Sequence, residues 1–504
     1  MTGKLKEEQK ISAEKKWIAL LSLAVFLTIA TYFIISYFNN KKGFTGKDKS
    51  VVVLPFENYS NDPSQESFVN GITEEITTQL AKIADIKVIG RNSAVLFKKN
   101  NKSLDKIGEV LGVSAYLEGS VQKIGNGVRI TAQLIDANTQ EHIWADRYDR
   151  DLKDIFSMQS EVAEQIANKL HVKLTEEERS RINKKPTDNI EAYKFYRKGR
   201  FFWDQRTKTS FDSAEINYKK AIELDPDYAL AYSGLADLYI YNLKGLSQLK
   251  AIPIARDYAT RALSLDSTLS EPLTTLGFIQ SAFDYDWVTA KKTLETAIAL
   301  NPNYPTAHLF YGNLLQYTGE NEEGGLDEIK KALALDPLSV NLNYVLGRNF
   351  YCARKYDSAY EQLEKAIAFD SAFNLSKGNF IYVLLQRKNY PEAFELIKQL
   401  PQQAISVVDY YQGATLSYAY AVSGDIIKAK TELIKTLAQY PDQSPYNIAR
   451  VYIALNNFSE AFNYLEKAYA QRDIWMYVLK VDPTFDPIRN EPRYKELVKK
   501  MRLI

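Results

Sequence analysis

The stretches AIELDP (221–226), ALSLDS (262–267), AIALNP (297–302), ALALDP (332–337) and AIAFDS (366–371) decide how most of this 504-residue chain folds. Each is an apolar helical stretch that ends at Asp or Asn followed by Pro or Ser, and proline cannot continue a helix. The ends of the last four phrases are 35, 35 and 34 residues apart. Such a period predicts helical hairpins that stack into a solenoid.

Packing positions inside the repeats carry a resemblance to a known family. The fifth repeat shows them most clearly, at Leu346, Gly347, Phe350, Ala359, Leu363 and Ala366. Together with the period, they resemble the tetratricopeptide repeat. The resemblance implies an all-α superhelical solenoid of about eight hairpins over residues 190–472, after a linker at 174–189. A C-terminal cap is expected at 473–504, which contains DPTFDPIRNEPRYKELVKKM (482–501).

A concave face is expected from such an array, because each hairpin has an apolar stripe that only its neighbours can bury. The resemblance implies that this face binds a protein or peptide partner. On the family's register the first helix of each repeat offers ten side chains to the groove: Asp237, Asn313, Gln316, Asn341, Tyr344, Arg348, Tyr351, Tyr418, Tyr446 and Arg450. Rigid aromatic rings and guanidinium groups suit protein recognition. Tyr also fills packing positions in these repeats, so a core role is the alternative.

A different pattern, typical of a small α/β domain, covers residues 50–173. VVVLPF (51–56) and IKVI (86–89) are short β-branched runs, and apolar residues at helical spacing lie between them. Three alternating segments at 115–121, 128–135 and 141–148 predict an antiparallel meander. A helix at about 154–173 is expected to close the domain.

Three strings in this region resemble the TolB-amino-terminal-like domain. They are LPFENYSNDPSQESFVNGITEEI (54–76), IGEVLGVSAYLEGSV (107–121) and VRITAQLIDANTQEHIWADRYDRDLKDIF (128–156). That domain often accompanies tetratricopeptide arrays in bacterial membrane-bound regulators of the CadC and adenylate-cyclase type. In those relatives the output module lies on another part of the chain. Residues 1–16 form only a short N-terminal tail here, so we expect the output domain to be lacking.

An uncharged run at 17–38 (WIALLSLAVFLTIATYFIISYF) predicts a single transmembrane helix, because its length suffices to cross about 30 Å of hydrocarbon. Trp17, Tyr37 and Phe38 are placed as interfacial anchors. A cleavable signal peptide is the alternative. Five lysines before the run against four after it barely favour an inside N-terminus. With the family resemblance, this predicts an inner-membrane protein whose remaining chain is periplasmic.

Composition and motifs argue against catalysis and nucleic-acid binding. The formal net charge is +2, which gives no field to attract nucleic acid. Cys352 is the only cysteine and the three histidines lie far apart, so no metal and no cofactor are expected. The acidic group Asp146, Asp149, Asp151 and Asp154 lacks cation-loop spacing and is interleaved with Arg147 and Arg150, which favours an ion-paired surface.

The sequence therefore favours a multidomain, non-enzymatic scaffold: one transmembrane helix, an α/β domain and a helical array that binds a protein partner. The alternative is an envelope sensor that transmits ligand binding across the membrane to a separate output protein. The identity of the partner and the oligomeric state stay open.

Overall fold

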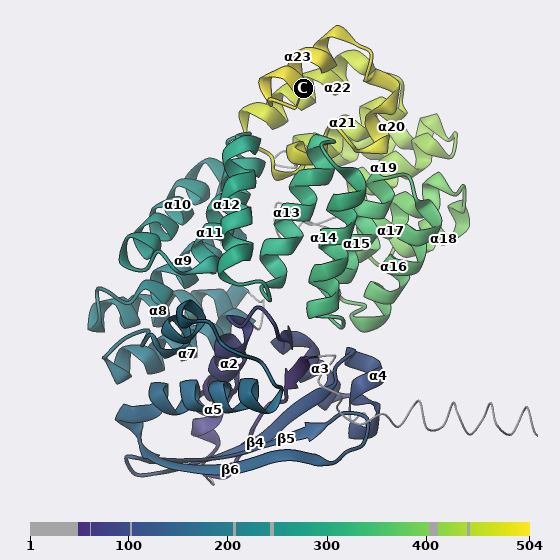
Figure 1. Cartoon of the computed structure of the whole chain (residues 1–504). Coiled ribbons are helices and arrows are strands. Elements are labelled where there is room, and N and C mark those ends of the chain that lie inside the picture. The colour runs from purple at the N-terminus through teal and green to yellow at the C-terminus, as the bar shows by residue number, and fades with distance from the viewer. Residues whose placement is uncertain are drawn as a thin grey trace, which may run out of the picture.

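The computed structural model describes residues 49–503, apart from 61, 101–102, 205–207, 242–245, 403–411 and 441–443. Within this part of the chain, a small domain with one mixed sheet lies against one edge of a curved stack of helices (Figure 1). The fold is therefore mostly a helical solenoid with a small sheet region.

The sheet has the strand order β3-β1-β4-β5-β6, and β2 pairs with β4. Its strands are β1 (Ser50–Val53), β2 (Glu57–Asn58), β3 (Lys87–Ile89), β4 (Ala115–Ile124), β5 (Gly127–Asp136) and β6 (His142–Asp151). The first three pairings are parallel, and the β4-β5-β6 meander is antiparallel. β1 is fully buried, as an apolar run at the centre of a covered sheet should be.

Helices cover both sides of the β1 half of the sheet. They are η1 (Pro63–Gln65), α2 (Glu66–Ala81), α3 (Arg91–Lys99), η2 (Leu104–Lys106), α4 (Ile107–Leu111), η3 (Leu152–Asp154) and α5 (Ile155–Lys169). One apolar cluster joins α2 and α5 to one face, and a second joins α3 and α4 to the other. α6 (Glu176–Asn183) follows, and its N-terminus is closed by a capping box between Thr175 and Glu178.

The array consists of antiparallel helix pairs. In chain order they are α7 (Ile190–Asp204) with α8 (Lys208–Leu224), α9 (Ala229–Tyr241) with α10 (Gln248–Leu265), α11 (Ser270–Ala282) with α12 (Trp287–Leu300), α13 (Pro305–Thr318) with α14 (Glu322–Leu335), α15 (Val340–Cys352) with α16 (Tyr356–Phe369), α17 (Asn374–Gln386) with α18 (Tyr390–Ile397), α19 (Gln412–Val422) with α20 (Ile426–Gln439), and α21 (Pro445–Ala454) with α22 (Phe458–Ala470).

Small residues allow the two helices of a pair to pack closely. A Cβ placed on Gly347 in α15 would lie 2.6 Å from the Leu363 side chain in α16, closer than real Cβ atoms approach. A Cβ placed on Gly312 in α13 would likewise lie 2.6 Å from the Gly325 carbonyl oxygen in α14. A side chain at either glycine would therefore force the two helices of the pair apart, so this close packing requires glycine at both positions.

The turns between repeats seat the α/β domain. The Asp336 carboxylate follows α14 and accepts hydrogen bonds from the Ser93 backbone N–H, at 2.9 Å, and from the Ser93 hydroxyl. Asn303, which follows α12, accepts from the Val88 N–H at 3.0 Å and donates to the Ile86 carbonyl at 2.8 Å. The Asp that ends the fourth phrase, and the Asn directly after the third, therefore also bind the α/β domain.

A buried ion-pair network between α2 and α7 also joins the α/β domain to the array. Arg197 donates to Glu74 at 2.5 Å, and Arg200 and Arg91 also lie within ion-pair distance of that carboxylate. Burial alone would raise the pKa of Glu74, but the three guanidinium charges outweigh it and lower the pKa to about 2. Glu74 is therefore ionised and holds the first hairpin against the α/β domain.

The prediction of a transmembrane helix, and with it a single-pass inner-membrane localisation, is corrected. Among the helices of the described residues, none is both long enough and apolar enough to cross a bilayer. The longest array helix, α10, has 18 residues and carries Lys250, Arg256, Asp257 and Arg261. Helices without Asp, Glu, Lys or Arg are shorter, such as α13 with 14 residues and α19 with 11. The predicted span at 17–38, with Trp17, Tyr37 and Phe38, lies outside the described residues. We do not retain the span in the architecture.

Candidate functional site

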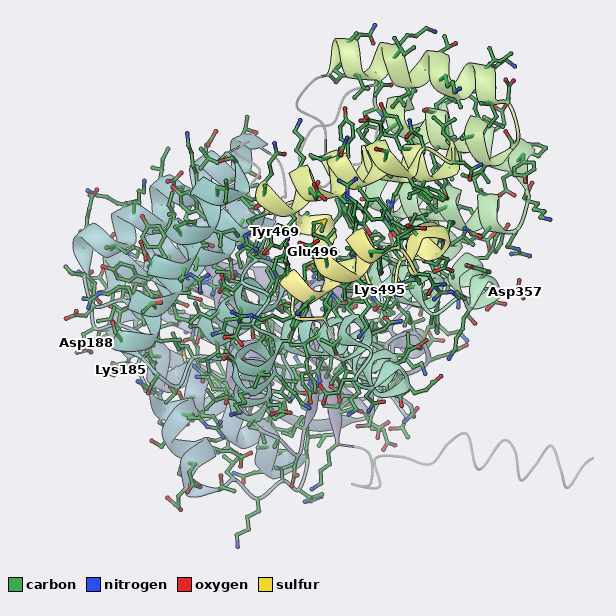
Figure 2. The ribbon with its side chains drawn as sticks, turned by 90° about the horizontal axis from the view of Figure 1, so that it is seen from above. Lys185, Asp188, Asp357, Tyr469, Lys495 and Glu496 are labelled. Carbon is green, nitrogen blue, oxygen red and sulfur yellow. The ribbon has the colours of Figure 1, made fainter. Side chains whose placement is uncertain are left out.

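The concave face of the array is occupied by the end of the chain itself. After α22 the chain returns as η4 (Ile474–Val478), η5 (Pro483–Ile488) and α23 (Pro492–Lys500), which we call, with their connections, the C-terminal segment (residues 473–503). Seen from above in Figure 2, this yellow segment, with Lys495 and Glu496, lies between the teal and the green hairpins. Its apolar side chains belong to the same core cluster as the array helices.

Most of the predicted groove residues lie beneath this segment or against neighbouring helices. Eight of the ten are buried: Asn313, Gln316, Tyr344, Arg348, Tyr351, Tyr418, Tyr446 and Arg450. Asp237 is half-buried and accepts a hydrogen bond from Thr275, and Asn341 is exposed. The predicted set is thus largely brought together, with the groove already filled.

The deepest polar contact joins α21 to the C-terminal segment. The Asp482 carboxylate accepts hydrogen bonds from Arg450, through Nη2 at 2.6 Å and Nε at 3.0 Å, and from the Tyr446 hydroxyl at 2.8 Å. All three side chains are at least nine-tenths buried. Burial alone would raise the pKa of Asp482, but Arg450 outweighs it, so the pKa is lowered. This is a buried, hydrogen-bonded ion pair, which fixes the segment's register.

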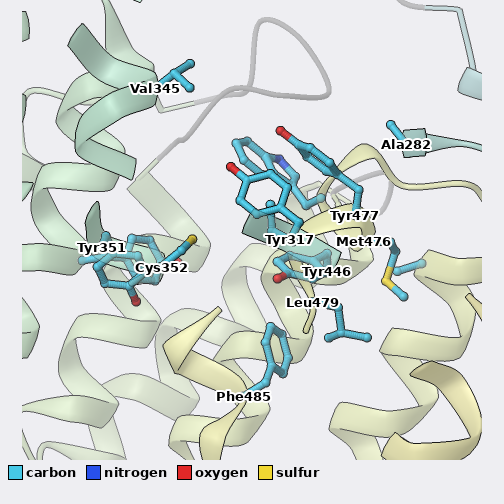
Figure 3. Close-up of a cluster of buried hydrophobic side chains, with 14 of the residues drawn as sticks. Ala282, Tyr317, Val345, Tyr351, Cys352, Tyr446, Met476, Tyr477, Leu479 and Phe485 are labelled. Atoms are coloured by element: carbon cyan, nitrogen blue, oxygen red, sulfur yellow. The ribbon is translucent and has the colours of Figure 1, made fainter. Parts of the chain in front are cut away.

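The Asp482 loop continues this contact along the segment. Asp482 also accepts from the backbone N–H of Thr484 at 3.0 Å, so that it caps η5 while it pairs with Arg450. Phe485 follows, fully buried, with its ring 5.1 Å from the ring of Tyr446 (Figure 3). One aspartate and one aromatic ring, three residues apart, thus anchor the segment on α21.

Arg348 forms a second centre in the groove. Its guanidinium lies 5.5 to 5.8 Å from the ring centroids of four aromatic residues: Tyr317, Tyr344, Trp475 and Tyr477. Tyr477 packs edge-on against Tyr317 at 5.0 Å (Figure 3). Arg348 Nε is buried without a hydrogen-bond acceptor within the described residues. Ring faces attract the charge but accept its N–H groups poorly, so a carboxylate would be a better partner.

The C-terminal segment also bridges distant hairpins. The Trp287 indole at the start of α12 donates to the Met501 carbonyl at 2.8 Å. Tyr285, beside it, stacks on Tyr469 of α22 at 5.8 Å, and Arg472 lies over both rings. The third and eighth hairpins are therefore linked both directly and through the C-terminal segment.

The inner polar residues of α13 and α15 bind each other. Asn349 donates to the Asn313 side-chain oxygen at 3.0 Å, and Gln316 donates to the Asn349 carbonyl at 2.8 Å. These amides link successive repeats and are not offered to a ligand. Their sequence positions alone could not distinguish these two roles.

Sequence reasoning missed the partner of Arg450. Asp482 belongs to the expected cap, and its role in the groove was not foreseen. The available signal was IWMYVL (474–479), an apolar run with no helical period, followed by an Asp-Pro pair like those between repeats. An aperiodic apolar run beside an array must bury itself on a preformed surface.

Two further groups bear on chemistry at this face. Burial raises the pKa of the Cys352 thiol to about 12, which leaves it protonated and unreactive at neutral pH. Within the described residues, no group of three or more His, Cys, Asp or Glu side chains could hold a metal ion. His308 instead bonds Glu328 at 2.7 Å and the Pro302 carbonyl at 2.9 Å.

Comparisons with known proteins agree with the repeat architecture. Residues 444–471, which span α21 and α22, match the tetratricopeptide repeat family, so the chain carries a tetratricopeptide-type array. A protein named putative adenylate cyclase 3 from Rhizobium meliloti (strain 1021) is 42% identical over 187 residues, which cover 37% of this chain. The match spans only 32% of that protein's length.

Solved structures that resemble the chain include several repeat proteins. The tetratricopeptide protein TTC0263 of Thermus thermophilus has 18% identity and a TM-score of 0.33, covering 38% of this chain and 99% of that one. The type IV pilus biogenesis factor PilW has 15% identity and a TM-score of 0.31, covering 50% of this chain and 96% of that one.

Proposed function

We propose that this chain is a non-enzymatic protein-interaction scaffold whose array recognises a peptide segment bearing an aspartate and aromatic side chains. One observation carries the proposal: the concave face already holds such a segment, in cis. Asp482 on Arg450 and Tyr477 beside Arg348 are contacts of the kind that anchor peptides at interfaces.

The partner's segment is proposed to take the place of part of the C-terminal segment. Arg348 supports this, because among the described residues its buried guanidinium faces aromatic rings and the Tyr344 hydroxyl rather than a carboxylate, which an acidic ligand would supply. The C-terminal segment competes with any partner for the groove. A partner must therefore bury enough surface to replace the several fully buried side chains of that segment. Binding is therefore expected to be selective.

The α/β domain is proposed as a second docking surface of the same scaffold, and as the TolB-amino-terminal-like domain that its strings resemble. Its contacts with the inter-repeat turns are buried and polar, which supports a fixed orientation relative to the groove. The name of the Rhizobium meliloti relative describes a protein of which the matched part is 32%, so we do not extend cyclase activity to this chain.

A peptide competition experiment tests the proposal. A fluorescent peptide of residues 473–491 is titrated into the full-length chain and into Asp482→Ala, in which the segment in cis has lost its ion pair. The expected result is binding at least about 10-fold tighter to the variant, because each 1.4 kcal/mol removed from the cis contact is a factor of about ten.

A scrambled peptide of the same composition serves as the control and is expected not to bind. Near-ultraviolet circular dichroism checks that the variant keeps its tertiary structure. If the folded variant binds neither peptide, the groove is a purely structural surface and the proposed function is wrong.

A further inference from the structure

The open edge of the sheet is β6, the last strand in the order. It is ten residues long, pairs with β5 on one side, and has no strand on its other side within the described residues. In Figure 1 it forms the lower margin of the α/β domain, away from the array. A long unpaired edge presents backbone N–H and C=O groups to any strand of matching chemistry.

The register with β5 fixes which backbone groups point outward. Gly127 lies opposite Asp151, and the next pair is closed by a hydrogen bond from the Leu152 N–H to the Asn126 carbonyl at 2.8 Å. In an antiparallel ladder such bonded pairs alternate with non-bonded ones. Even-numbered residues of β6 therefore bond to β5, and Arg147 and Asp149 direct their backbone groups to the open edge.

The charges along this edge alternate in sign. The central residues read Asp146, Arg147, Tyr148, Asp149 and Arg150. Reversed and laid antiparallel to itself about Tyr148, the strand places Asp146 opposite Arg150 and Arg147 opposite Asp149. Opposite charges directly across a strand pair stabilise it.

We propose that β6 pairs with β6 of a second copy of this chain, antiparallel about a two-fold axis at Tyr148, to form one continuous sheet through a symmetric dimer. The two-fold makes each charge pair occur twice. Arg147 and Asp149 become hydrogen-bonded opposites, as their outward backbone groups require. Tyr148 lies opposite its own copy, as a non-hydrogen-bonded aromatic pair.

Charge and backbone direction select this register among the alternatives. A slip that brings Arg147 opposite Arg147 of the other copy places like charges at the axis, and the slip in the other direction does the same for Asp149. A register of odd offset would oppose inward to outward backbone groups, which cannot bond. Among axes at the five central residues, 146–150, only the axis at Tyr148 avoids like charges at the centre and keeps outward backbone groups opposite each other.

In a single copy, side chains of the same strand cover the edge. Asp146 accepts from the Arg147 backbone N–H at 2.8 Å, and Arg150 donates to the Asp149 carbonyl at 3.1 Å. These two contacts satisfy backbone groups that would otherwise be exposed at the edge of the strand. In the dimer the Arg147 N–H and the Asp149 carbonyl form ladder hydrogen bonds with the other copy instead. The Asp146 and Arg150 side chains then form ion pairs across the two strands.

Sedimentation velocity of the full-length chain over a concentration series tests the pairing through charge reversal. The wild-type chain is expected to form a species of twice its 57.5 kDa mass. Asp146→Arg and Arg150→Asp each create two like-charge contacts per dimer, so each is expected to weaken association at least about 10-fold. The Asp146→Arg/Arg150→Asp double variant and an equimolar mixture of the two single variants both restore opposite pairs, and association should return.

Asp357→Arg, on α16 at the outer edge of the array in Figure 2, is the matched control and should dimerise as wild type does. The pairs are solvent-exposed, so added salt should also weaken the wild-type dimer. A monomeric wild-type chain, single variants that associate as wild type does, or a double variant no better than the singles would each overturn the proposal. The mixture keeps the test decisive even if one single variant is less stable.

Discussion

The array meets two other parts of the chain in chemically different ways. Its concave face packs on the C-terminal segment through aromatic and aliphatic side chains in one continuous core, with a single deeply buried ion pair at Asp482 among the described residues of that contact. Its inter-repeat turns meet the α/β domain through amides, hydroxyls and carboxylates such as Asn303 and Asp336. The first contact is stabilised mainly by buried apolar area, and the second mainly by directional hydrogen bonds.

The difference teaches how each contact responds to change. Apolar burial is non-directional and sums over many atoms, so the groove contact should weaken in proportion to the apolar area that is lost. Polar contacts at the turns are directional and few, so the α/β domain should loosen locally when one partner is lost. The four predictions below test this contrast.

Phe485→Ala is expected to have the largest effect. The ring is fully buried against Tyr446, and large-to-small changes at such positions cost about 3–5 kcal/mol. Urea-induced unfolding followed by circular dichroism measures the loss. Phe369→Ala, at a residue that is 43% exposed on α16, is the control and should cost far less. Equal costs would contradict a core role for the segment.

Acid should break the ion-pair network at Glu74. Its folded pKa is about 2 against an ordinary 4.5, so its stabilisation is present above pH 4.5 and is lost as the pH falls toward 2. The loss should be on the order of 3 kcal/mol, the usual cost of breaking a buried ion pair. Unfolding measured across this window should show a shallower pH dependence in Glu74→Gln. An unchanged slope would argue against the network.

Asn303→Ala should release the sheet from the array without opening the groove. The side chain bonds Val88 and Ile86 and lies 3.2 Å from the carbonyls of Ala81 and Ile83, so its loss should cost about 2 kcal/mol. Hydrogen exchange should speed up over residues 81–89 and stay unchanged over 474–488. Asn341→Ala, at an exposed position, is the control.

Asp370→Ala should have the smallest effect. Asp370 ends the fifth helical phrase at the position that Asp336 holds in the fourth, yet it is exposed and bonds only locally, to the Ala372 N–H at 2.8 Å. A change within about 0.5 kcal/mol in thermal unfolding is expected. Asp336→Ala should cost more, because it leaves the buried Ser93 groups without their acceptor. Similar costs would show that the turn, not the docking, matters.

The sequence predicted the repeat register and part of the groove for a physical reason. Leu346, Gly347 and Leu363 recur at positions set by helix geometry, and geometry is local. The same reasoning named Tyr446 and Arg450 as groove residues, and in the structure both are buried and hydrogen-bonded to Asp482. Their partner, Asp482, was not found, since a contact 32 residues away along the chain leaves no periodic mark.

The membrane span shows the opposite limit. An uncharged run of sufficient length is a strong local signal, yet the described helices include none that could cross a bilayer. The run itself, residues 17–38, lies outside the described residues.

The amino-acid sequence by itself determined the helical solenoid, through its period, and the small sheet, through its β-branched runs. Tertiary structure alone decided that the groove is filled in cis, that Asp336 and Asn303 bind the α/β domain, and that β6 is left at the edge. The periodic pattern of a helix or a strand is local, and it can be recognised within a short stretch of sequence. Which surfaces meet depends on the whole chain, because burial and hydrogen bonding join residues that the sequence keeps far apart.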